Sequence, residues 1–270
     1  MFLCLTSGHR GSTTEAVIPD FPPACLYQAP FAGAAGQGFQ LWLLYPRRCT
    51  LSEAELHLSV PPQDIARGSA ECSSASRRDF LTRRLALRRL LAARLAVSDS
   101  RSLDIRLSPT GKPQLSMSSG KDPHYDFSLS QSGELCVIAL AAAADGTGHP
   151  PSPSIGVDVE ALATAPDVSM FRRYATEEEQ RSALAAGLEN DAHTRCLWWT
   201  RHEAIAKASG RGLPWGLRRL SVPLDWSEGS AATIEDSRDG RAYTLRSYGS
   251  VRGFIISVAL GVDSLRADSR

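Results

Sequence analysis

The sequence has almost no net charge and no long hydrophobic run. Its 30 basic and 29 acidic residues leave a formal charge of +1, so any electrostatic attraction to a partner must be local. The longest apolar run, residues 135–144, is about half of what a membrane-spanning helix needs. The first ten residues also lack the basic and apolar regions of a signal peptide. We therefore expect a cytoplasmic protein with no membrane partner.

Motifs of several common enzyme classes are missing as well. The six cysteines are scattered, with no CxxC pair and no Cys/His cluster at zinc spacing. No GxSxG, HExxH, Walker A or GxGxxG pattern occurs. What remains is an ordinary globular composition, 43% hydrophobic and 22% charged, in a chain long enough for one large domain or two modest ones.

The first half of the chain predicts a long helix accompanied by strands. Residues 1–40 contain scattered Pro and Gly and show no sustained period, and a strand is expected at 39–46. Residues 77–95 are the strongest helix candidate, because Ala, Leu and Arg favour helices and no Gly or Pro interrupts them. A strand, a turn and a strand follow at 102–117, and two further strands at 125–140 are joined by a Ser-Gly turn.

A segment rich in Gly, Pro and Ser at residues 145–154 predicts a linker. We therefore expect an N-terminal lobe over residues 1–150, including an irregular N-terminal extension, and a C-terminal lobe over residues 151–270. The apolar strands that end the two halves resemble each other weakly, and each half has a long helix before them. This similarity suggests duplicated lobes.

The C-terminal lobe begins with a short strand and continues with helices. Helices are expected near residues 175–187 and 193–210, and a last strand near 253–262. Thr176 and Glu179 have the spacing of a capping box at the start of the first helix.

Two acidic residues interrupt the apolar strand that begins the C-terminal lobe. Val157 and Val159 alternate with Asp158 and Glu160, and side chains two residues apart share one face of a strand. On an edge strand both acids could simply be solvated. In an apolar setting they would need compensation, and Mg²⁺ suits such oxygen ligands. Glu203 is the available third acid.

Charged residues on two predicted helices also have two readings each. Glu203 and Lys207 are four residues apart on one helix face, which suits an ion pair as well as a shared site. Residues 77–94 carry seven arginines and one acid. Arg84 and Arg88 fall on the leucine stripe of that helix, so they either extend along its surface to water or face a bound anion such as phosphate.

Six segments, in order, resemble the Sfp-type 4'-phosphopantetheinyl transferase family. They span roughly residues 77–213 and read RRDFLTRR, GKP, FSLSQSG, GVDVE, FRRYATEEE and WWTRHEAIAKASGRGL. The specific part is the pairing of G-[IV]-D-[IV]-E with a later W-x-x-K-E-[AS]-x-x-K and G-x-G-L. Residues 1–76 match no motif of the family.

The resemblance implies an α+β fold of two similar lobes related by pseudo-twofold symmetry, each a small antiparallel sheet packed on a long helix. Coenzyme A would bind between the lobes. The enzyme would transfer the 4'-phosphopantetheine arm of coenzyme A to a serine of an apo acyl or peptidyl carrier protein and release 3',5'-ADP. The carrier would serve fatty-acid, polyketide or nonribosomal-peptide synthesis, and an internal repeat would make a monomer sufficient.

The resemblance also assigns roles to residues of this chain. Asp158, Glu160 and Glu203 would bind Mg²⁺, with Mn²⁺ as a possible substitute. Glu203 would act as the general base and Lys207 would neutralise or protonate the departing phosphate. Coenzyme A contacts are expected from Arg77, Arg84, Lys112, Ser130, Gln131, His202 and Lys207. Carrier contacts are expected from Phe171, Arg172 and Arg173, because carrier domains are typically acidic around their serine.

Two positions depart from the family pattern. Gln131 replaces a histidine and His202 replaces a lysine, and both changes remove positive charge from the predicted anion site. We therefore expect weaker coenzyme A binding or an altered pH dependence. The alternative function is a degenerate homologue that binds coenzyme A or a carrier protein without catalysis. An Arg-rich nucleic-acid binder is disfavoured, because interleaved aromatics and a basic overall charge are missing.

Overall fold

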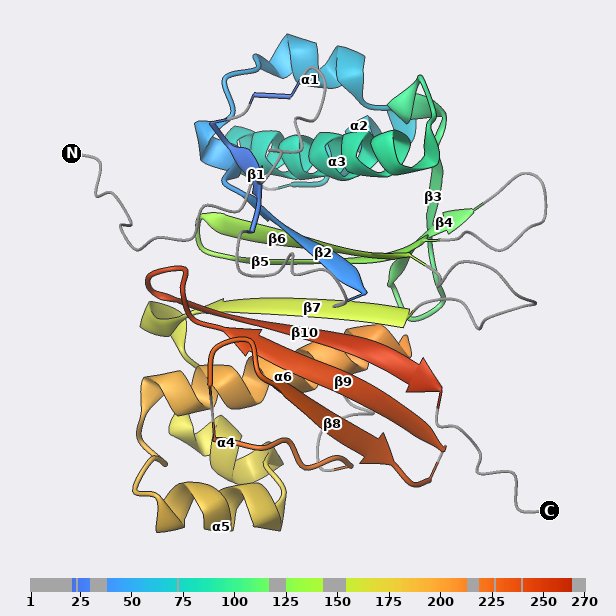
Figure 1. Cartoon of the computed structure of the whole chain (residues 1–270). Helices are drawn as coiled ribbons and strands as arrows, with labels where there is room; N and C mark the ends of the chain where they lie inside the picture. The colour runs from blue at the N-terminus through green and yellow to red at the C-terminus, as the bar shows by residue number, and fades with distance from the viewer. Residues whose placement is uncertain are drawn as a thin grey trace, which may run out of the picture.

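Two antiparallel four-stranded sheets and two long helices form the framework of the protein (Figure 1). The computed structural model describes residues 21–22, 24–29, 38–71, 73–116, 125–142, 154–212, 219–225, 227–238 and 240–263. The expected α+β fold is confirmed. The pseudo-twofold relation stays a prediction, and the expected boundary at residue 150 lies outside the described residues.

The first sheet has the strand order β1-β2-β6-β5 and packs against helix α3. Its strands are β1 (Leu26–Gln28), β2 (Phe39–Leu44), β5 (Tyr125–Ser132) and β6 (Leu135–Ala142), and the helices of this half are α1 (Glu53–Ser59), α2 (Pro62–Gly68) and α3 (Ser74–Leu95). A small hairpin, β3 (Asp104–Leu107) and β4 (Pro113–Ser116), links α3 to β5. Single turns of 3-10 helix occur at Pro46–Arg48, Ser100–Ser102 and Leu162–Thr164.

The second sheet has the order β7-β10-β9-β8 and packs against helix α6. Its strands are β7 (Ser154–Ala161), β8 (Ala231–Asp236), β9 (Arg241–Tyr248) and β10 (Phe254–Asp263), and its helices are α4 (Val168–Tyr174), α5 (Glu177–Ala185) and α6 (Ala192–Ser209). The predicted capping box of Thr176 and Glu179 is present at the start of α5.

Alternation along the strands produces three apolar layers. Odd residues of β2, such as Leu41, face the second sheet, whereas Trp42 on the opposite face packs on α3. Val157 of β7 and Val258 of β10 lie in the layer between the sheets. Ala259 lies in the layer under α6. The order is therefore helix, sheet, sheet, helix, as Figure 1 shows. No helix within the described ranges is long and apolar enough to cross a membrane.

Arg84 and Arg88 neither extend to water nor face open space. Both are buried, and both donate to Asp64 of α2, at 2.8 Å from Arg84 Nε to Oδ1 and 2.6 Å from Arg88 Nε to Oδ2. Arg88 also donates to the carbonyl of Leu103 at 2.7 Å. Asp64 therefore offsets one of the two positive charges, and Nη2 of each arginine has no hydrogen-bond partner among the described residues. Pairing with an internal acid differs from both readings of their spacing.

Candidate functional site

Strand β7 places Asp158 and Glu160 on the face that meets α6. The other face of β7 is buried between the sheets. Gly156 lies on the same face as the acids, and a Cβ atom there would be 1.9 Å from the carbonyl oxygen of Ala204 and 2.4 Å from the amide nitrogen of Ala208. The backbones of β7 and α6 are therefore in contact at Gly156. This contact holds α6 close to the acids of β7.

Asp158 is the most enclosed acid of the group, with 3% of its surface exposed. Its Oδ1 accepts hydrogen bonds from Lys207 Nζ at 2.7 Å and from Ser130 Oγ at 2.6 Å. Lys207 Nζ also donates to Ser130 Oγ at 3.1 Å and to the carbonyl of Val157 at 3.2 Å. The other oxygen, Oδ2, is buried and has no hydrogen-bond partner among the described residues. An unpaired buried carboxylate oxygen is costly, so Asp158 is suited to bind a ligand.

Glu160 and Glu203 surround this group with further negative charge. Burial raises the pKa of Glu203, and the nearby charges of Asp158 and Glu160 raise it further, against the opposing effect of Lys207. Burial also raises the pKa of Glu160, with a hydrogen bond from Ser132 opposing it and Asp158 adding to it. The three predicted metal ligands therefore lie close enough to influence one another.

The residues fit a divalent cation without forming a complete cage for one. Within the described ranges, no three Asp, Glu, His or Cys side chains are grouped closely enough to hold a metal ion by themselves. Mg²⁺, however, is usually bound by one or two carboxylates together with water and substrate phosphates. The unpaired oxygen of Asp158 and the raised pKa values of its two neighbours are what such an ion would relieve.

The edges of the two sheets meet along β5 and β7, which run side by side (Figure 1). Side chains of β5 accept hydrogen bonds from backbone amides of β7. The contacts are Ile155 N to Asp126 Oδ2 at 2.9 Å, Val157 N to Ser128 Oγ at 3.0 Å and Ala161 N to Ser132 Oγ at 3.0 Å. We call this set of contacts the seam. It uses backbone donors that an open sheet edge would leave unpaired, and the acids lie directly beside it.

Lys112 lies at the other end of the seam. Its Nζ donates to Asp126 Oδ2 at 2.6 Å and to the carbonyl of Ile155 at 3.0 Å. In the same turn, Thr110 Oγ1 donates to the carbonyl of Gly210 at 2.7 Å, so the hairpin β3–β4 contacts the end of α6. Asp126 and Ser130 are four residues apart, so Lys112 lies roughly 13 Å along β5 from the acids.

Two predicted coenzyme A contacts are not brought to this place. Arg84 is bound to Asp64, as described above. His202 is 1% exposed, and its Nε2 lies 2.8 Å from Glu179 Oε1. Glu179 also accepts from the amide of Val222 at 2.8 Å and from Trp198 Nε1 at 3.2 Å. Position 202 thus fastens α6 to α5, and its histidine does not remove charge from the acidic site.

The other predicted contacts lie on β5, α3 and α4. Gln131 is exposed on β5 and accepts a hydrogen bond from Arg83 Nη1. Arg77 is partly exposed, with Nη1 3.8 Å from Glu53 Oε1. On α4, Phe171 is buried and packs edge-to-face on Trp198, so it supports the helix from inside.

The two arginines of α4 are exposed. Arg172 Nε donates to Glu189 at 2.8 Å, and Arg173 stacks over the ring of Tyr174. They form the outer surface of the predicted carrier-binding segment.

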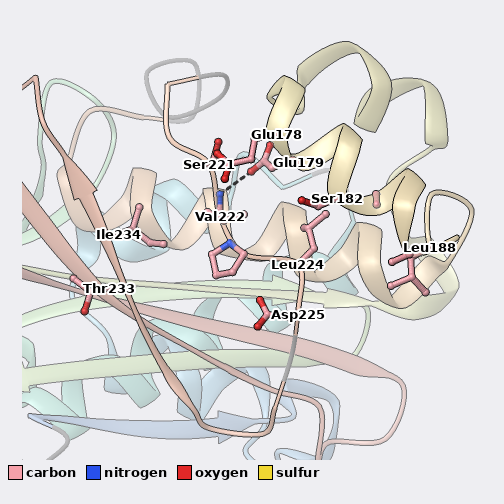
Figure 2. A pocket seen from close by; sticks show the side chains of 13 residues that line it. Glu178, Glu179, Ser182, Leu188, Ser221, Val222, Leu224, Asp225, Thr233 and Ile234 are labelled. Atoms are coloured by element: carbon pink, nitrogen blue, oxygen red, sulfur yellow. Dashed lines mark hydrogen bonds between the residues drawn. The ribbon is translucent and has the colours of Figure 1, made fainter.

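A separate pocket of about 670 Å³ lies between α5, residues 221–225 and β8. Figure 2 shows Glu178, Ser182 and Asp225 around it, with Glu179 turned toward Val222. None of the predicted site residues lines this pocket, so it is distinct from the acidic site.

Sequence reasoning missed Gly156 and Ser132 as residues that shape the site. Gly156 could have been found, because an isolated glycine in a buried strand often marks close backbone approach. Ser132 gave no such signal, because alternating serines are also typical of a solvated strand face.

Asp158, Glu160, Glu203 and Lys207 thus lie together at the junction of the two sheet-and-helix layers. The 4'-phosphopantetheinyl transferase superfamily matches residues 154–259, which contain the acids and α6. A protein of Synechocystis sp. (strain ATCC 27184 / PCC 6803 / Kazusa), named a putative 4'-phosphopantetheinyl transferase, is 28% identical over 211 residues, 77% of this chain and 78% of the relative. Both comparisons confirm the resemblance to 4'-phosphopantetheinyl transferases that the motifs predict, and both support a transferase enzyme.

Proposed function

We propose that the protein transfers the 4'-phosphopantetheine arm of coenzyme A to a serine of an apo acyl or peptidyl carrier protein. The serine oxygen forms a new bond to the phosphorus of the pantetheine arm, and the bond from that phosphorus to 3',5'-ADP breaks. The observation that carries the proposal is Asp158, a buried acid with one oxygen held by Lys207 and the other unpaired.

Asp158, Glu160 and Glu203 are the residues that would hold Mg²⁺ or Mn²⁺. When bound, such an ion offsets the negative charge of the pyrophosphate during attack. Asp158 would contribute Oδ2, since its Oδ1 is already engaged by Ser130 and Lys207. The unpaired oxygen therefore gives this acid a direction for binding.

Glu203 is suited to accept the proton of the carrier serine. The resemblance assigns this role to it, and Glu203 lies beside Lys207 within electrostatic reach of Asp158 and Glu160. Lys207 carries the compensating positive charge beside it and would neutralise or protonate the departing phosphate oxygen.

Coenzyme A phosphates would lie along the seam, near Lys112, Ser130, Gln131 and Lys207. Lys112 must then exchange Asp126 for a phosphate, since its ammonium is bound to that acid in the free protein. Arg77 is a more distant candidate. Arg84 and His202 are left out of the proposed contacts, because each is buried with an internal partner.

The exposed arginines of α4, Arg172 and Arg173, would attract the acidic surface of a carrier domain. Their contribution would be to the rate of encounter more than to the strength of the complex. Phe171 would hold α4 in place from the core.

Intact-mass measurement of a panel of apo carrier proteins, with coenzyme A and Mg²⁺, tests the proposal. We expect one carrier class to gain one phosphopantetheine, and Asp158→Ala and Glu203→Ala to abolish the gain. Glu235→Ala, an exposed acid on β8, is the matched control and should retain full activity. If no carrier gains mass while calorimetry still detects coenzyme A binding, the protein is a binding-only homologue.

A further inference from the structure

Ser132 connects the seam to the acidic site through a single hydroxyl group. Its Oγ accepts a hydrogen bond from the amide of Ala161 at 3.0 Å and donates one to Glu160 Oε2 at 2.9 Å. The residue is 8% exposed. A hydroxyl has one proton to donate, so that proton is committed to the glutamate while the backbone of β7 fixes the position of the oxygen.

Serines at alternate positions of β5 make different uses of the same geometry. Ser128 Oγ accepts from the amide of Val157 at 3.0 Å, as Ser132 does from Ala161, but no carboxylate of the described residues contacts it. Ser130 donates to Asp158. The two hydrogen bonds between a β5 serine and a β7 acid each join residues 28 apart in the chain. They therefore share one register of β5 against β7, and a slip of one residue would break both hydrogen bonds.

We propose that Ser132 is a positioning residue that sets the direction of the Glu160 carboxylate for binding a divalent cation. This inference rests on the proposed function. A glutamate side chain has several rotatable bonds, and burial alone does not select one orientation of its oxygens. The hydroxyl of Ser132, held by the backbone of the neighbouring strand, favours one, with a smaller contribution from the side chain of Trp199. Strand β5 thereby orients an acid that strand β7 carries.

Second-layer contacts of this kind alter metal affinity measurably. Removing a hydrogen-bond partner of a metal ligand typically weakens metal binding about 10- to 100-fold. We expect Ser132→Ala to raise the Kd for Mn²⁺ by that factor. The KM for Mg²⁺ should rise in parallel, and kcat should recover at saturating metal. Ser132→Thr keeps the hydroxyl and should restore much of the affinity.

Ser128→Ala is the matched control. Ser128 is as buried as Ser132, at 4% exposure, and its substitution also removes one seam hydrogen bond. Both alanine variants should therefore lower the melting temperature to a similar extent, whereas Ser128→Ala should leave the Kd for Mn²⁺ near the parent value. This comparison separates loss of the seam from loss of orientation.

Electron paramagnetic resonance of free Mn²⁺, in the presence of coenzyme A, gives the affinities independently of catalysis. Unchanged Mn²⁺ affinity in Ser132→Ala, or an equal loss in Ser128→Ala, overturns the inference even when the parent enzyme is fully active. A parent protein that binds Mn²⁺ but modifies no carrier refutes the proposed function, and the variants still judge the role of Ser132. A parent protein that binds no Mn²⁺ refutes both.

Discussion

Gly156→Ala should separate the two elements that form the acidic site. The added Cβ would lie 1.9 Å from the carbonyl oxygen of Ala204 and 2.4 Å from the amide nitrogen of Ala208. Both atoms belong to the backbone of α6, so neither can rotate away. Helix α6, which carries Glu203 and Lys207, must therefore move away from β7.

The size of the movement follows from these distances. Ordinary contact begins at 3.4 Å, so the carbonyl oxygen must move by about 1.5 Å from its 1.9 Å position. Overpacking of a core costs about 1–3 kcal/mol, occasionally more, and we expect the upper end because the clash is between backbones. The melting temperature should fall by roughly 6–12 °C. A misplacement of about 1 Å at a reacting group can reduce the rate about 100-fold.

Differential scanning calorimetry and the carrier mass assay, normalised to folded protein, measure both effects. Gly68→Ala is the matched control, since its Cβ would meet only the side chains of Leu81 and Phe80, at 3.2 Å. That variant should retain parent activity and lose little stability. If Gly156→Ala melts at the parent temperature, the contact between β7 and α6 is wrong. If Gly156→Ala is destabilised but transfers at the parent rate per folded molecule, the reaction does not depend on the exact position of α6 relative to β7.

Three further predictions concern charged and polar groups outside the group of Asp158, Glu160, Glu203 and Lys207. Gln131→His adds a titratable donor at an exposed position of β5 and should tighten coenzyme A binding as the pH falls through about 6.5. His202→Lys should leave the affinity for coenzyme A unchanged and destabilise the fold by about 1–3 kcal/mol. Calorimetry in which His202→Lys tightens coenzyme A binding and Gln131→His does not would refute the placement of these residues. Asp64→Ala should cost about 3–5 kcal/mol in urea unfolding because it leaves buried guanidinium groups unpaired, and a loss below about 1 kcal/mol would contradict that role. Burial opposes the charge of Glu179, but the hydrogen bond and charge of His202, together with hydrogen bonds from nearby amides, hold the pKa of Glu179 below its ordinary value. The ionised carboxylate therefore stabilises the fold above about pH 4, and this stabilisation is lost at lower pH. The difference in unfolding free energy between the parent and Glu179→Gln should shrink as the pH falls from about 5 to about 3.

Local periodicity was enough to predict which faces carry the acids and the lysine of the candidate site. The alternation in β7 placed Asp158 and Glu160 on one face, and the four-residue spacing placed Glu203 and Lys207 on one face of α6. The structure brings these faces together, with the ammonium of Lys207 on Asp158. Lys207 therefore forms an ion pair between α6 and β7, and this tertiary contact is not revealed by helical spacing.

Elements without a repeating pattern were not predicted. Helices α1, α2 and α4 are seven residues long, which gives too few turns to show a helical period. Asp64 lies in one of them, so the acid that compensates Arg84 and Arg88 could not be anticipated. The position of these arginines on a leucine stripe left two readings open, extension to water and contact with a bound anion. The pairing with Asp64 depended on how α2 packs against α3.

The balance of charge in the acidic site links the structure to the proposed chemistry. With all three carboxylates ionised, Asp158, Glu160 and Glu203 contribute three negative charges, and Lys207 offsets one of them. The remaining two equal the charge of one divalent cation. In the free protein, burial and, to a lesser extent, the neighbouring carboxylates raise the pKa values of both glutamates. Lys207 leaves Asp158 Oδ2 unpaired, so the lysine and a cation can bind the same acid without competing for one oxygen.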